Sequence, residues 1–193
     1  MEPEIVFATN NAHKLQEARA ILKDKIKVLS LGDIGCHDDI LETADTLEGN
    51  AMIKARWVKE KYGYDCFADD TGLMVDALDG APGVYSARFA GEHCSPSDNI
   101  ALLLQKLEGE KNRKARFATV VALIHDGEEH IFSGEVNGEI SEDYCGNSGF
   151  GYDPVFIPEN SAMSFAEMTP DAKNAISHRG RAMRKLADYF ESL

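Results

Sequence analysis

The segment from Phe117 to Ile124 constrains the fold more than any other part of the chain, because both of its faces are mostly apolar. Such a pattern is typical of a central strand that is covered on both sides. Asp126-Gly127-Glu128-Glu129 follows, and its Asp-Gly pair predicts a hairpin turn into a second strand from His130 to Val136. The sequence therefore predicts a central strand that is joined by a hairpin turn to a second strand.

Helical and strand patterns alternate along the rest of the chain. The apolar spacing predicts helices at about Ala12–Lys23, Gly49–Lys61, Ser95–Leu107 and His178–Glu191. Short apolar runs predict strands at Ile5–Ala8, Cys66–Ala68, Leu73–Val75 and Val155–Ile157. This mixture predicts an α/β protein with a mixed sheet, in which residues 1–193 form one domain.

Composition excludes several classes of partner. The net charge of −13 argues against binding to nucleic acid or to an anionic membrane, since both need a basic surface. No apolar run reaches the roughly 20 residues of a membrane span, and no secretory leader is recognisable. The four cysteines are widely spaced, as reduced thiols are. We expect a soluble, cytoplasmic protein, whose cations must gather locally if it binds a polyanion.

Two adjacent carboxylates, Asp69 and Asp70, lie where an apolar segment is predicted to give way to a turn. They should repel each other, and a hard cation such as Mg²⁺ would offset that repulsion. Glu42 offers another carboxylate for the same ion. The alternative readings are a solvated Asp-Asp turn and a solvated loop acid. Cys36-His37-Asp38-Asp39 is read as a solvated loop, since adjacent residues rarely converge on one metal.

Two segments place cations at helix starts. The turn from Thr9 to Lys14 leads from a strand into a helix, where backbone N–H groups and the helix dipole favour an anion. Lys173, His178 and Arg179 lie near the start of the last helix, where a cation is unfavourable unless an anion compensates. Lys54 shares a helix face with Asn50. An ordinary capped helix and exposed cations are the alternatives.

Glycines and aromatic residues are interleaved in Ser148-Gly149-Phe150-Gly151-Tyr152-Asp153-Pro154. Glycine allows a ligand to approach the backbone closely, and an exposed aromatic ring stacks on a nucleobase. Asp153 offers a hydrogen-bond acceptor to a base edge. The alternative is a tight turn whose aromatic rings belong to the core.

Taken in order, these segments resemble the inosine triphosphate pyrophosphatase family, which removes non-standard purine nucleotides. The resemblance covers essentially the whole chain and also includes Gly80-Ala81-Pro82-Gly83-Val84-Tyr85-Ser86-Ala87-Arg88. It implies an elongated mixed sheet flanked by helices in two lobes with a cleft between them, a homodimer and Mg²⁺ dependence. The implied reaction hydrolyses ITP, dITP or XTP to the nucleoside monophosphate and pyrophosphate.

The resemblance also implies roles for individual residues. Asp70 would be the proton acceptor and a metal ligand, Glu42 a further metal ligand, and Asp69 a supporting catalytic carboxylate. The triphosphate would be held by Thr9, Asn10, Asn11, Ala12, His13, Lys14, Lys54 and Thr71. Phe150 would stack on the base in a pocket shaped by Gly151, Tyr152 and Asp153, and Lys173, His178 and Arg179 would read the 6-oxo purine edge.

Three positions depart from the family pattern. Asn10 stands where glycine is frequent, Gly49 where a glutamate commonly precedes Asn-Ala, and Thr71 where serine is frequent. Gly49 removes a potential metal ligand. Two other functions stay open: a pyrophosphatase of similar fold acting on modified pyrimidine nucleotides, and a nucleotide-binding regulator without catalysis. The Glu42, Asp70 and Lys14 set argues against the regulator.

Overall fold

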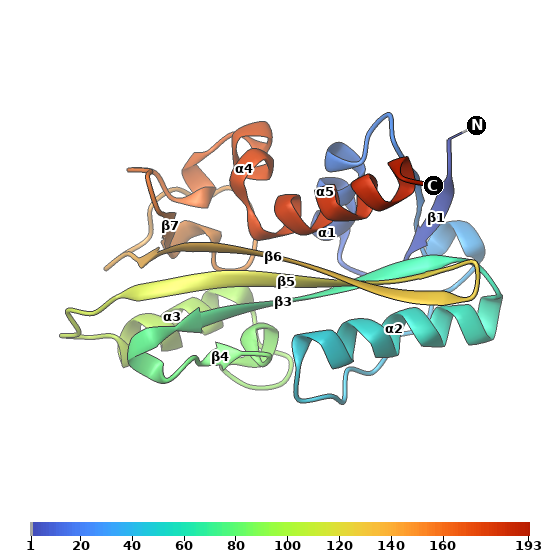
Figure 1. Ribbon diagram of the computed structural model, residues 1–193. Coiled ribbons are helices and arrows are strands. Elements are labelled where there is room, and N and C mark those ends of the chain that lie inside the picture. The colour runs from blue at the N-terminus through green and yellow to red at the C-terminus, as the bar shows by residue number, and fades with distance from the viewer. Residues whose placement is uncertain (1) are drawn as a thin grey trace. The chain divides into compact units, whose positions relative to one another are not determined.

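The computed structural model describes residues 2–193 and divides into two compact units (Figure 1). The first unit contains the chain up to Asp70 together with Thr119–Gly134 and His178–Leu193. The second contains Thr71–Ala118 and Glu135–Ser177. The chain therefore enters and leaves the first unit more than once, and each unit has its own core.

Seven strands form one mixed sheet. They are β1 (Glu4–Phe7), β2 (Lys27–Leu29), β3 (Cys66–Val75), β4 (Pro82–Gly83), β5 (Lys114–His125), β6 (Glu128–Ile140) and β7 (Phe156–Pro158). Hydrogen-bonded neighbours follow the order β2-β1-β3-β5-β6-β7, and β4 pairs with β3. β1 is parallel to β2 and β3, whereas β3–β4 and β6–β7 are antiparallel. The predicted α/β class with a mixed sheet is confirmed.

Within residues 2–193, five α-helices accompany the sheet: α1 (Ala12–Ile21), α2 (Leu47–Tyr62), α3 (Pro96–Lys106), α4 (Pro170–Ile176) and α5 (His178–Glu191). The four predicted helices are confirmed, and α3 begins with the capping box of Ser95 and Asp98. α4 was not predicted, because seven residues are too few for a clear apolar period. Between residues 2 and 193 no helix combines the length and apolar character that crossing a bilayer requires.

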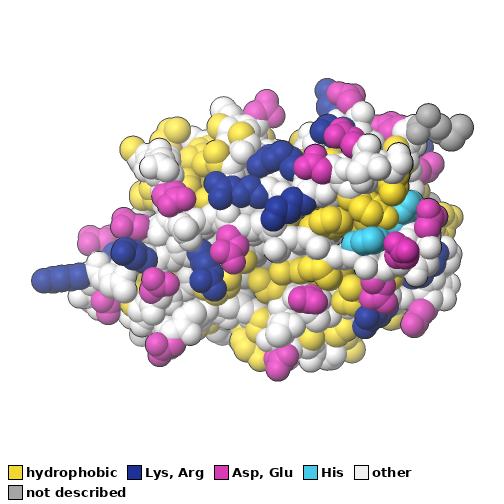
Figure 2. All heavy atoms as spheres, viewed as in Figure 1, with side chains coloured by type: hydrophobic (Ala, Val, Ile, Leu, Met, Phe, Trp, Pro, Cys, Tyr) yellow, Lys and Arg dark blue, Asp and Glu magenta, His cyan; other side chains and the backbone are white. Residues whose placement is uncertain are grey.

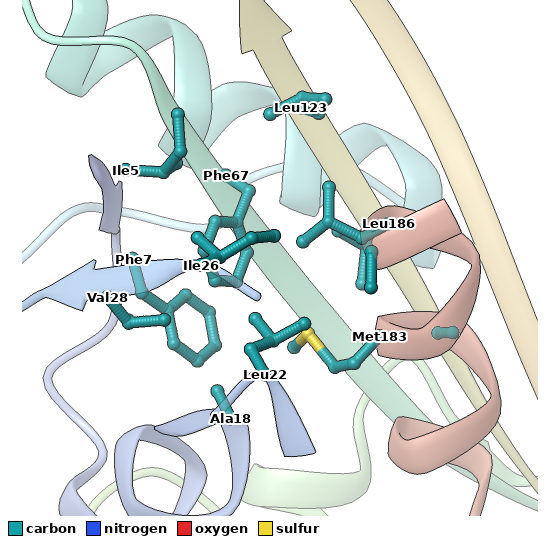
Figure 3. Packing of buried hydrophobic residues seen from close by; sticks show 13 residues of the cluster. Ile5, Phe7, Ala18, Leu22, Ile26, Val28, Phe67, Leu123, Met183 and Leu186 are labelled. Carbon is teal, nitrogen blue, oxygen red and sulfur yellow. The ribbon is translucent and has the colours of Figure 1, made fainter. Parts of the chain in front are cut away.

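In the first unit, helices cover both faces of the sheet. Phe7 and Phe67 point to one face, where their rings stack at 4.5 Å and pack with residues of α1 and α5 such as Ala18 and Met183 (Figure 3). The residues next to them in the strands, such as Val6 and Ala68, pack on the other face with α2. Side chains alternate along a strand, so each helical layer packs against every second residue of the strand.

The second unit has a separate core. Phe117 and Phe156 meet at 4.6 Å between ring centroids, and Phe165 packs against both. Apolar residues of α3, such as Leu103, complete this cluster. The predicted two-faced burial of the segment from Phe117 to Ile124 is confirmed, since each of its residues except Val120 is buried.

Two predicted boundaries were wrong. Cys66–Ala68 and Leu73–Val75 are not separate strands around an acidic turn, because β3 is continuous and carries Asp69 and Asp70 in its middle. Neighbouring cations make the burial of these carboxylates tolerable, as described below. The hairpin strands are also longer than predicted: Glu128 and Glu129 belong to β6, and only Asp126-Gly127 forms the turn.

Candidate active site

Asp69 and Asp70 point to opposite faces of β3, because successive side chains of a strand alternate. Asp69 lies on the face that Phe67 shares with α1 and α5, and Asp70 on the face that Ala68 shares with α2. The partners of the two carboxylates agree with this assignment. The expected close repulsion between them is therefore wrong, and the two carboxylates have different partners.

Asp69 is completely buried and neutralised by cations from two helices. Lys14 Nζ of α1 lies 3.2 Å from its Oδ1, and Arg179 Nε of α5 donates to its Oδ2 at 3.1 Å. Burial alone would raise the pKa of Asp69, but these two cations and Lys54 hold that pKa well below its ordinary value. Asp69 is thus a permanently charged centre that joins α1 and α5 to β3.

Arg179 is also buried, with 2% of its side chain exposed. Its second partner is Glu17 of α1, whose Oε1 accepts a hydrogen bond from Nη1 at 2.5 Å. Sequence reasoning missed Glu17, although it lies three residues after Lys14 and so shares a face of the same helix. The reading of Arg179 as an exposed cation was wrong. The anions that compensate Lys14 and Arg179 at helix starts include carboxylates of the protein itself.

Asp70 has different surroundings. Only 6% of the residue is exposed, and Asn50 Nδ2 of α2 donates to its Oδ2 at 3.1 Å. Burial and the nearby charge of Glu42 raise the pKa of Asp70 from 3.8 to about 6. Asn50 was noted in the sequence only for sharing a face with Lys54. Asp70 is therefore a carboxylate with an enhanced proton affinity, which suits a general base near neutral pH.

Glu42 reaches this region from the connection between β2 and α2. Its Oε1 lies 2.8 Å from Lys54 Nζ, and Lys54 also donates to the backbone oxygen of Asp69. Burial would lower the pKa of Lys54, but Asp69 and Glu42 raise it above its ordinary value. The structure thus brings Glu42, Lys54 and Asp70 together, as the sequence predicted.

The position of Gly49 requires glycine. A Cβ atom there would lie 2.7 Å from Ala44 Cβ and 2.9 Å from Thr46 Oγ1, closer than carbon and oxygen atoms pack. The Gly49 N–H also donates to Thr46 Oγ1, which caps α2. Gly49 departs from the family pattern because Ala44 and Thr46 lie against it and leave no room for a glutamate side chain.

The turn from Thr9 to Lys14 is used in part by its own side chains. Asn11 Oδ1 accepts hydrogen bonds from the N–H groups of His13 and Lys14, and so caps α1. Ala12 and His13 are exposed and Thr9 is half-buried. Asn10 directs its amide group to Asp38 and Asp39. The segment predicted to cradle phosphate therefore has two of its donors occupied by Asn11.

Asp70 and Glu42 fit a hard divalent cation. Burial and the charge of Glu42 raise the pKa of Asp70 in the protein alone, and a bound divalent cation would offset the repulsion between the two carboxylates. Asp69 does not fit such a role, since both of its oxygens contact cations. Of the three acidic groups predicted for this site, two are suited to hold Mg²⁺ and one to organise the surrounding lysine and arginine.

In the second unit, Asp153 organises the segment from Ser148 to Pro154, in which glycines and aromatic residues alternate. Asp153 Oδ2 accepts a hydrogen bond from Lys173 Nζ at 2.7 Å and another from the Phe150 N–H at 3.0 Å. Lys173 Nζ lies 4.7 Å from the centroid of the Phe150 ring, a cation–π distance. Phe150, Asp153 and Lys173 therefore form one group, in which Asp153 fixes both the backbone and the lysine.

Two neighbours serve this segment structurally. Tyr152 is buried in the core of the second unit and donates its hydroxyl to the Ser86 backbone oxygen at 2.6 Å, so the core reading holds for this ring. Gly149 has φ +76, and a Cβ there would lie 2.3 Å from Asp153 Oδ2. Gly151 also has positive φ. Thr71 follows Asp70 in β3 and belongs to this unit, while His178 is buried at the start of α5 in the first.

Figure 2 shows several basic side chains gathered near the middle of the face in view, with acidic ones more widely scattered around them. The cations of the first unit that surround Asp69 are instead largely buried, as the exposed fractions of Lys14, Lys54 and Arg179 show (15%, 8% and 2% of the side chain). The cations around Asp69 are thus internal to the first unit rather than part of its exposed surface.

Comparison with known proteins decides the family. The sequence profile of the Ham1 family matches residues 5–189. This chain belongs to the Ham1 family. It is 55% identical to the dITP/XTP pyrophosphatase of Flavobacterium johnsoniae, with 96% of each chain covered. It is 54% identical to the protein of the same name from Porphyromonas gingivalis, with 97% of each covered. The resemblance inferred from the motifs is confirmed.

Solved structures of Ham1 proteins share the fold. The HAM1 protein of Coxiella burnetii matches with a TM-score of 0.89 at 38% identity, over 99% of this chain and all of that one. A structure titled nucleoside-triphosphatase / dITP/XTP pyrophosphatase, from Mycobacterium abscessus, matches with a TM-score of 0.75 at 41% identity. It covers 95% of this chain and 98% of that one.

Proposed function

We propose that this Ham1 protein hydrolyses non-standard purine nucleoside triphosphates, namely dITP, XTP and ITP, to the nucleoside monophosphate and pyrophosphate. Two relatives that match nearly the full chain at 54–55% identity are named dITP/XTP pyrophosphatases. The structural observation that carries the proposal is Asp70, a nearly buried carboxylate beside Glu42 with a pKa raised to about 6. Such a group is ionised at neutral pH and accepts a proton readily.

In the proposed reaction, water attacks the α-phosphorus while the bond from that phosphorus to the bridging oxygen breaks. Pyrophosphate leaves with the electrons of this bond, and Asp70 takes the proton that the water loses. Asn50 holds the Asp70 carboxylate in place through its hydrogen bond. Most of the catalysis in phosphoryl transfer is positioning and charge stabilisation, so the rigid frame of Asp69, Lys14 and Arg179 is part of the machinery.

Mg²⁺ is proposed as the cofactor, with Glu42 and Asp70 as its protein ligands. When bound, the ion would supply positive charge to the phosphate oxygens. Lys14 and Lys54 would contribute further positive charge from α1 and α2. Thr9, Asn10, Asn11, Ala12, His13 and Thr71 would complete the contacts to the triphosphate.

We assign recognition of the base to the group around Phe150. Its ring would stack on the purine, and Gly151, Tyr152 and Asp153 would shape the pocket. Lys173, His178 and Arg179 would donate to the 6-oxo group. A 6-amino group would turn N–H groups instead of an acceptor toward these donors, and that mismatch would select against ATP.

The resemblance also leads us to propose a cytoplasmic homodimer. Analytical ultracentrifugation would test the dimer, and cell fractionation the location.

A substrate panel tests the function. Pyrophosphate release would be measured from dITP, XTP, ITP, dUTP and ATP, each with Mg²⁺ and with a chelator. We expect the three non-standard purines to be turned over fastest and only with the metal. Faster turnover of dUTP would favour a pyrimidine pyrophosphatase, and binding without turnover would favour a regulator.

A further inference from the structure

The connection from Gly35 to Thr46 carries Glu42 but has no helix or strand after Gly35 until α2 begins. Glu42 repels Asp70, and the connection carries two further acids, Asp38 and Asp39. Something must therefore hold this segment against the first unit. The contacts that do so decide where Glu42 lies.

Asn10 makes the contact that links this connection to the start of α1. Its Nδ2 donates to the Asp38 backbone oxygen at 3.1 Å and to Asp39 Oδ1 at 3.2 Å. Lys61 of α2 holds the side chain of Asp38 from the other side, with Nζ 2.6 Å from Oδ2. A glycine at position 10, which is frequent in the family, has no side chain to make the Asn10 contacts.

The linked residues are close to Glu42 in the chain. Asp39 precedes Glu42 by three residues, a stretch that spans at most about 10 Å when extended. Fixing Asp39 therefore restricts the position of the Glu42 backbone from the N-terminal side. On the C-terminal side, the Ala44 N–H donates to Asn50 Oδ1 at 2.9 Å. Glu42 is held between these two tethers.

We infer that Asp39, through its hydrogen bond with Asn10, is a positioning residue that keeps Glu42 in place to bind the divalent cation. The inference rests on the proposed function only in its assignment of Glu42 as a metal ligand. It gives a role to the Cys36–Asp39 segment, for which the sequence predicts only a solvated loop. It also gives the departure from glycine at position 10 a physical purpose.

Titration with Mn²⁺ as the probe ion, read by electron paramagnetic resonance on protein without nucleotide, tests this inference. Asp39→Ala should weaken Mn²⁺ binding by about five-fold, the equivalent of one modest hydrogen bond, and Asn10→Gly, which removes both Asn10 contacts, by at least as much. Asp39→Asn should bind like the wild type, because it keeps the Oδ1 acceptor. Asp45→Ala is the matched control, since it removes an exposed acid from the same connection.

Each outcome decides the matter. Unchanged Mn²⁺ affinity in Asp39→Ala would overturn the inference alone, and so would an equal loss in Asp39→Asn, which would point to charge rather than to the hydrogen bond. A wild-type protein that binds no Mn²⁺ would overturn the metal assignment and this inference with it. Thermal unfolding of each variant would show that the fold is retained, as expected for exposed positions.

Discussion

Replacing Asp69 and Asp70 by asparagine, one at a time, should shift thermal stability in opposite directions although the residues are adjacent. Asp69→Asn removes a buried charge on which Lys14 and Arg179 converge. Breaking one partner of a buried ion pair typically costs about 3–5 kcal/mol. For a chain of this size each kcal/mol lowers the melting temperature by about 2–4 °C, so we expect a loss of at least about 6 °C.

Asp70→Asn should stabilise the metal-free protein. The folded protein raises the pKa of Asp70 from 3.8 to about 6, so carrying its charge above pH 6 costs about 3 kcal/mol, as an upper figure. Asparagine removes this cost and keeps an oxygen for the hydrogen bond from Asn50. We expect the melting temperature to rise by a few degrees.

Thermal unfolding followed by circular dichroism at pH 7, in the presence of a chelator, is the assay. The wild type and Asp45→Asn, an exposed acid, serve as references. The reasoning is refuted if both active-site variants lose stability equally, because Asp70 would then be a structural charge like Asp69.

Three further predictions follow from the same geometry. The stability of the metal-free wild type should fall as pH rises from about 4 to 6, because a raised pKa favours the protonated Asp70, and Asp70→Asn should lack this slope in a pH series of unfolding curves. Phe150→Ala should raise KM by about 5- to 150-fold with a smaller effect on kcat, because stacking worth about 1–3 kcal/mol is shared by bound substrate and transition state. An unchanged KM in steady-state kinetics would assign the ring to structure. Gly49→Glu should lower the unfolding free energy by about 1–3 kcal/mol in urea titrations, because a Cβ atom at this position has no room. We expect it to add no metal ligand, and tighter Mn²⁺ binding would contradict this.

Much of the fold could be predicted from periodicity alone. The helices α1, α2, α3 and α5 each bury one apolar stripe, and that stripe is visible in the sequence. The short α4 and the three-residue β2 were not predictable, because they are too brief to show a period. The sequence predicts two strands in place of β3 for a different reason. Adjacent aspartates are normally exposed to solvent, and only cations from other segments make their burial here tolerable.

The candidate site was predictable as a set of residues but not as a set of roles. Asp70, Glu42 and Lys54 lie together as expected. The division of labour between Asp69 and Asp70 depends on which helix covers which face of β3, and no local pattern encodes that. Glu17 escaped notice because an acid on a helix surface is ordinary until Arg179, 162 positions later, is known to meet it.

The measurement that tests the central assignment most directly is pyrophosphate release from dITP by Asp70→Asn at saturating Mg²⁺. If Asp70 is the proton acceptor, turnover should fall by at least about 100-fold while the protein remains folded. Turnover within a few-fold of the wild type would contradict the assignment.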